Sequence, residues 1–230
     1  MPNPLVFVDT ETTGLYPHLG HEIWEWASIR IDNADQFTAE FCDNRLFFDS
    51  LSIRAHQRDI ESLAMNLADP MALNISGIFD RHAHHRGDYH GLTTASDPSL
   101  AQMIAKETRG ATWVGAVPGF DVNMVTKFLL DMNYTPGMWH YHLIDIECLV
   151  AGSLGEGVLD PPWKYKNLQT LVNPEIPILA EGVGKHSALG DAFIVMLLYF
   201  YLQGLEDLGR WRDVWDYVNA PYTSKVERSA

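Results

Sequence analysis

The chain has 230 residues, of which 47% are hydrophobic and 20% are charged, and its formal net charge is −14. This composition excludes a disordered chain, and no apolar stretch approaches the roughly 20 residues of a membrane span. The acidic balance argues against broad electrostatic binding to nucleic acid, which depends on Lys and Arg, but it allows a nuclease whose metal site is a carboxylate cluster.

We expect one domain over residues 1–230, because a chain of this length can bury a single α/β core with long insertions. The N-terminus lacks the basic and apolar regions of a signal peptide. We therefore expect a cytoplasmic protein that does not contact a membrane.

The N-terminal part of the sequence predicts three strands. Residues 5–8 form a short apolar run that is typical of a strand buried on both faces. The runs 22–32 and 36–42 predict two further strands, joined by a polar turn at 33–35 and therefore antiparallel neighbours.

Residues 43–97 are predicted to be an insertion after the third strand. Within it, residues 59–66 favour a helix and 72–79 favour a turn into another short element. The polar loop 81–90 contains several histidines, namely His82, His84, His85 and His90. We favour a solvated loop over a transition-metal site, because cysteines are absent and the spacing is irregular. A further hypothesis is that Arg81 and Arg86 contact a phosphate backbone.

The second half of the sequence alternates helices and strands. The predicted elements are a helix at 98–108, a strand at 111–117, a helix at 120–133, a strand at 139–150, a long helix from Ser187 and a last amphipathic helix at 206–219. This order indicates an α/β protein with a mixed sheet flanked by helices, followed by a C-terminal helical extension at 206–230.

Two carboxylates follow the first strand. If the strand continues, Asp9 and Glu11 point to the same side, because side chains two residues apart share a face. Such a pair repels unless a cation lies between the two groups. The alternative is that Asp9 caps a turn and Glu11 faces water.

Two more aspartates lie on predicted helices. Asp121 begins the apolar stripe of the helix at 120–133, where it either caps the helix or points into a site. Asp191 lies within the buried stripe of the long helix, so its charge needs a partner, either an Arg or a metal ion shared with the other acids. His186 directly precedes this helix.

These residues occur in three motifs: "FVDTETTGL" with Asp9 and Glu11, "GFDVNMVTKFL" with Asp121, and "HSALGD" with His186 and Asp191. With these motifs in this order, the sequence resembles the DEDDh (DnaQ-like) family of 3′-to-5′ exonucleases over residues 5 to about 200. The resemblance implies a ribonuclease H-like fold with a five-stranded mixed sheet flanked by helices.

The resemblance also implies a two-metal phosphodiester hydrolase that uses Mg²⁺ or Mn²⁺. By this resemblance Asp9 bridges both ions, Glu11 and Asp191 help to hold the ion that activates water, Asp121 holds the second ion through water, and His186 accepts the proton of the attacking water. The products would be nucleoside 5′-monophosphates released from a 3′ end.

By the same resemblance, the backbone at Thr12 and Thr13 and the side chain of Leu15 would contact the last nucleotide. Phe120 would add a stacking surface, although it is as easily explained as a core anchor of its helix. DNA is the favoured substrate, in proofreading or end trimming. RNA trimming by the same chemistry, and a non-catalytic module that binds a polymerase or a nucleic-acid end, stay open as alternatives. The sequence leaves the oligomeric state open.

Overall fold

The structure is a computed structural model, and it describes residues 4–45, 48–82, 93–154, 169–170, 172–179 and 187–223. His186 lies outside the described residues, and so do the four predicted loop residues His84, His85, Arg86 and His90. Within the described ranges, the helices are all too short or too polar to cross a membrane.

A mixed sheet of six strands forms the centre of the molecule, in the order β4-β3-β2-β1-β5-β6. β1 lies between β2, which is antiparallel to it, and β5, which is parallel to it. The strands are β1 (Leu5–Thr12), β2 (Ile23–Ile31), β3 (Leu51–Arg58), β4 (Thr93–Ala95), β5 (Thr112–Gly115) and β6 (Ile144–Asp145). The predicted mixed α/β fold is confirmed, with six strands in place of five.

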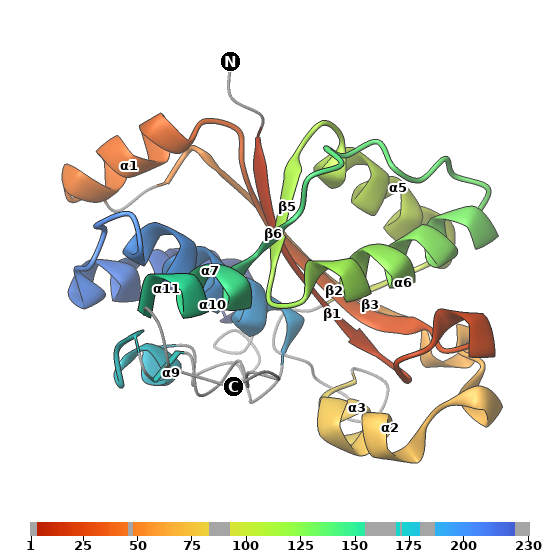
Figure 1. The fold of residues 1–230 in the computed structure, drawn as a ribbon. Helices are drawn as coiled ribbons and strands as arrows, with labels where there is room; N and C mark the ends of the chain where they lie inside the picture. The colour runs from red at the N-terminus through yellow and green to blue at the C-terminus, as the bar shows by residue number, and fades with distance from the viewer. Residues whose placement is uncertain are drawn as a thin grey trace.

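Helices cover both faces of this sheet (Figure 1). The helices are α1 (Ala34–Cys42), α2 (Pro70–Ser76), α3 (Ile78–Arg81), α5 (Asp97–Thr108), α6 (Pro118–Asp131), α7 (Ile146–Leu154), α9 (Ile176–Leu179), α10 (Ala188–Tyr201) and α11 (Leu208–Thr223), with short 3-10 turns η1 (Pro17–Leu19), η2 (Ile60–Ser62) and η3 (Met65–Leu67). One core packs Phe7 of β1 against α1, α10 and α11. The other packs Val6 and Val8 against α5 and α6. Successive residues of β1 therefore point into different cores.

The segment 36–42, predicted as a strand, is part of helix α1. The Asn33 side chain caps this helix by accepting a hydrogen bond from the backbone N–H of Gln36 at 3.1 Å. Phe37 and Phe41, four residues apart, are both buried, so the apolar pattern has the helical period. The third strand of the sheet is instead β3, which lies inside the predicted insertion and pairs with β2.

Three other segments also differ from their predictions. Residues 59–66 form the 3-10 turns η2 and η3 in place of a helix, and the segment around 72–79 forms the helices α2 and α3. Only Ile144 and Asp145 of the predicted strand 139–150 are in the sheet, and the chain then continues as α7.

The C-terminal helix α11 packs onto the domain, as its aromatic stripe predicts. Trp211 and Trp215 are buried in the core that contains Phe7 and α10. The Arg210 guanidinium donates to the carbonyl oxygens of Phe41 and Glu40 at 3.1 and 3.2 Å, which satisfies the end of α1. The extension is thus part of the core, which supports the face of the sheet that carries Asp9 and Glu11.

Candidate metal centre

The candidate site lies where the end of β1 meets the first turn of α10. Asp9 and Glu11 share the face of β1 that also carries Phe7, and α10 covers this face. Asp191 lies in the first turn of α10, whose start is capped by the Ser187 hydroxyl. One carboxylate oxygen from each of Asp9, Glu11 and Asp191 lies within 4.8 Å of the others. The structure therefore brings together three acids that are up to 182 positions apart.

Asp121 approaches the same point from the other side of β1. It is buried on α6, and its Oδ1 accepts a hydrogen bond from the Thr10 hydroxyl at 2.7 Å. Asp121 is not the N-cap of α6, which is Val117, and its carboxylate is engaged with Thr10 of β1. Asp121 lies outside the tight group of three acids, but its charge contributes to raising the pKa values of Asp9 and Glu11.

Burial raises the pKa values of all four acids, and repulsion from neighbouring carboxylates adds to this effect for Asp9, Glu11 and Asp191. For Asp9, burial raises the pKa well above its ordinary value, and the charges of Asp191, Asp121, Glu11 and Glu25 add to the effect. Burial likewise raises the pKa of Glu11, although Arg81 opposes the increase. The pKa of Asp121 rises to about 7, mainly through burial and against the Thr10 hydrogen bond. Burial raises the pKa of Asp191 to about 6, opposed by Arg81.

A fifth carboxylate, Glu25, was missed in the sequence. It lies opposite Glu11 in the register of β1 and β2, and it is fully buried. Its oxygens accept hydrogen bonds from Gln57 Nε2 at 3.1 Å and from the backbone N–H of Ala188 at 3.0 Å. The available signal was a charged residue between the tryptophans of an otherwise apolar strand, "IWEWASI".

Arg81 belongs to the site rather than to a solvent-facing surface. Its Nη2 lies 3.2 Å from Glu11 Oε1, and its Nη1 lies 3.4 Å from Glu25 Oε2. The side chain is buried, so the predicted contact of Arg81 with a phosphate backbone is wrong. The sequence predicted that a buried acid pairs with either an Arg or a metal ion. Because Arg81 contacts one edge of the cluster, both kinds of partner are compatible with the structure.

The donor chemistry of Asp9, Glu11 and Asp191 fits a divalent cation. Carboxylate oxygens are the hard ligands that Mg²⁺ and Mn²⁺ prefer. The contact of Arg81 with Glu11 joins Nη2 to Oε1 at 3.2 Å. One guanidinium cannot balance the charges of the surrounding acids, and a cation would remove the repulsion that raises their pKa values.

The turn after β1 contains the residues that are predicted to contact the substrate. Thr13 is buried, its N–H donates to the Glu22 carbonyl and its carbonyl accepts from the Asp69 N–H, both at 2.8 Å. The Thr12 hydroxyl donates to the Gly14 carbonyl at 3.0 Å. Leu15 is 60% exposed at the tip of the turn, free to contact a ligand. The two threonines fix this turn from inside.

Phe120 is partly buried and packs against the core between the sheet, α5 and α6. This position agrees with its interpretation as an anchor of α6. A stacking contact between Phe120 and a nucleotide stays a prediction.

The turn after β1 is tightly packed, which gives a stability prediction at Gly14. A Cβ at Gly14 would lie 2.2 Å from the imidazole Nδ1 of His21, which is held by the Tyr16 N–H at 2.9 Å. We expect Gly14→Ala to lower the free energy of unfolding by about 1–3 kcal/mol, as overpacking does. The matched control is Gly119→Ala, whose Cβ would meet no atom within 4 Å. Urea denaturation of both variants measures the difference, and equal stabilities would contradict this account.

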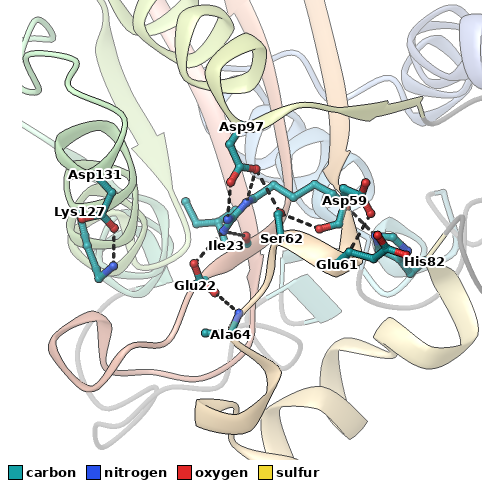
Figure 2. A network of polar contacts seen from close by, with 11 residues as sticks. Glu22, Ile23, Asp59, Glu61, Ser62, Ala64, His82, Asp97, Lys127 and Asp131 are labelled. Carbon is teal, nitrogen blue, oxygen red and sulfur yellow. Dashed lines mark hydrogen bonds and ion pairs between the residues drawn. The ribbon is translucent and has the colours of Figure 1, made fainter.

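A second buried arginine, Arg58, ties the insertion to the sheet. Its guanidinium contacts Asp97 at 2.7 and 2.8 Å and Glu22 at 3.3 Å. Figure 2 shows Glu22, Ser62 and Asp97 pointing toward one another. His82, predicted on a solvated loop, is buried, and its Nε2 lies 2.7 Å from the Arg58 carbonyl. The segment that ends in Arg81 and His82 is therefore packed against the sheet.

The three-dimensional arrangement matches known structures, whereas the sequence alone does not. No protein-family model matches the chain, and no curated protein matches its sequence. Three matching crystal structures are of E. coli exonuclease I: the zinc-bound form of its complex with single-stranded DNA (TM-score 0.55, 16% identity), a complex with a dA16 oligonucleotide (0.56, 16%) and the metal-free form of the single-stranded DNA complex (0.54, 15%).

These matches cover 90%, 93% and 93% of the chain, but only 43%, 43% and 42% of the exonuclease I chains. The chain thus spans less than half the length of the proteins that it matches. Over nine-tenths of its own length, it has the ribonuclease H-like α/β fold of E. coli exonuclease I.

Proposed function

We propose that the protein is a metal-dependent 3′-to-5′ exonuclease that releases nucleoside 5′-monophosphates. The observation that carries this proposal is the convergence of Asp9, Glu11 and Asp191 within 4.8 Å, in the fold of an exonuclease. A purely structural role gives no reason to bury several acids whose pKa values are raised by burial and by repulsion among neighbouring carboxylates.

In this proposal Asp9, Glu11 and Asp191 hold the metal, and Asp121 acts from the opposite side of β1. A bound divalent cation supplies Lewis-acid polarisation of the phosphodiester and lowers the pKa of bound water. The protein side chains orient the scissile phosphate and the attacking water in line. His186, one residue before the cap of α10, would accept the proton of that water.

Single-stranded DNA is the substrate that we favour. It is the ligand in the matching exonuclease I complexes, and the exposed Leu15 at the turn tip would contact the terminal nucleotide. An RNA strand presents the same phosphodiester and differs by its 2′-hydroxyl. The substrate experiment therefore compares the two polymers directly.

The proposal is tested by digesting 5′-labelled and 3′-labelled single-stranded DNA and RNA with Mg²⁺, Mn²⁺ or EDTA. We expect metal-dependent, stepwise shortening of the 5′-labelled strand, and immediate release of the label from the 3′-labelled strand. His186→Ala should lose about 10²–10⁴-fold in rate, the usual contribution of a general base. The control is His142→Ala, at an exposed histidine outside the site. Absence of cleavage with both polymers and both metals would reject the enzyme and favour a non-catalytic module that binds a polymerase or a nucleic-acid end.

A further inference from the structure

We propose that Arg81 is a positioning residue that holds Glu11, and through Glu25 the start of α10, in the geometry that binds metal. This inference rests on the proposed function, because it concerns the same acidic cluster. It adds a residue from α3, which lies in the segment between β3 and β4, to a site otherwise built from β1, β2, α6 and α10.

The Arg81 guanidinium is itself firmly held. Its Nε and Nη2 donate to the Ser76 carbonyl at 2.9 and 2.7 Å, and its Cζ lies 4.9 Å from the ring centroid of Trp24. The Arg81 carbonyl accepts a hydrogen bond from Gln57 Nε2 at 3.3 Å, which attaches its backbone to β3. A side chain fixed in this way can orient its neighbours at a small cost in conformational entropy.

From this position the two ends of the guanidinium face two different acids. Nη2 contacts Glu11 Oε1 at 3.2 Å, and Nη1 forms an ion pair with Glu25 Oε2 at 3.4 Å. The ion pair with Arg81 favours the orientation of the Glu11 carboxylate that is seen in the structure. Partners of this kind orient metal ligands, and their loss typically weakens metal binding about 10–100-fold.

Glu25 links Arg81 to the start of α10. Its Oε1 accepts from the N–H of Ala188, the first residue of that helix, and Asp191 follows within the same turn. A carboxylate at a helix N-terminus is favoured by the helix dipole, but a fully buried one also needs a counter-charge. Arg81 supplies that charge. When all five acids are ionised, Arg81 leaves a net charge of −4 around the site, which two divalent cations would balance.

The test is Mn²⁺ binding, measured by calorimetry on the full chain without substrate. We expect Arg81→Met to weaken Mn²⁺ binding about 10–100-fold. This variant also leaves Glu25 buried without a counter-charge, so it should lower the unfolding temperature. The double variant Arg81→Met/Glu25→Gln removes that unpaired charge and should regain stability, yet it should still bind Mn²⁺ weakly. If Arg81→Met does not fold, Mn²⁺ binding is measured on the double variant instead.

A matched control separates positioning from packing. Arg58→Met removes an equally buried arginine that pairs with Glu22 and Asp97, and it should lower stability without changing the affinity.

The alternative outcomes overturn different statements. Unchanged Mn²⁺ affinity in Arg81→Met, or recovery of affinity in the double variant, would show that Arg81 only balances the charge of Glu25. Tighter binding in Arg81→Met would show that Arg81 competes with the metal for Glu11. Failure of the wild-type chain to bind Mn²⁺ would instead reject the metal site of the proposed function.

Discussion

Asp9→Asn is expected to lower metal-dependent release of nucleotides about a thousandfold, the effect of losing the several kcal/mol that a correctly held metal contributes. Asp9 is central to the cluster, because the charges of Asp191, Asp121, Glu11 and Glu25 all act on it. The same change should stabilise the metal-free chain at neutral pH, because it removes a partly buried carboxylate whose ionisation is disfavoured. Single-turnover digestion and thermal unfolding without metal measure the two effects.

The opposite signs of these two effects make the test specific. A residue needed only for folding would lose activity and stability together, whereas a metal ligand should lose activity and gain metal-free stability. The control is Asp131→Asn, which changes an exposed carboxylate on α6 that pairs with Lys127, and activity should stay within about twofold. Full activity of Asp9→Asn would remove the acidic cluster from the mechanism.

The stability of the metal-free chain is expected to fall as the pH rises from about 4 to 8. In the folded chain the pKa of Asp121 is about 7 and that of Asp191 about 6, both above the ordinary value of 3.8. Between these values the folded chain keeps protons that the unfolded chain has released, so raising the pH favours unfolding. We expect the unfolding temperature, measured by calorimetry with EDTA, to be about 5 °C or more higher at pH 5 than at pH 8.

Two measurements assign this slope to the site. Asp121→Asn should reduce the change of unfolding temperature with pH, because the amide does not titrate. Mn²⁺ should stabilise the chain more at pH 8 than at pH 5, because a metal binds the deprotonated acids. A slope that is the same in wild type and Asp121→Asn, with and without Mn²⁺, would place its origin outside the cluster.

The sequence predicted the elements whose patterns are strong and local. α6 and α10 were predicted because their apolar residues follow the helical period, and β5 because a short apolar run has few alternatives. The segment 36–42 was assigned wrongly because its aromatic residues favour strands, while the Asn33 cap and the burial of Phe37 and Phe41 decide for a helix. β3 was missed because its alternating polar residues are typical of an insertion as much as of a strand.

The same division holds for the site. The sequence by itself pointed to four metal-ligand candidates, Asp9, Glu11, Asp121 and Asp191, because a carboxylate in an apolar pattern needs a partner, and the structure brings Asp9, Glu11 and Asp191 within 4.8 Å of one another. Only the tertiary structure decided that Glu25 and Arg81 join them. Their signals are weak in sequence, since a single Glu in a strand and an Arg beside a histidine-rich loop are usually solvent-exposed. The register of β1 against β2 and the packing of α3 on that face bury Glu25 and Arg81. They also bring the two opposite charges together as an ion pair.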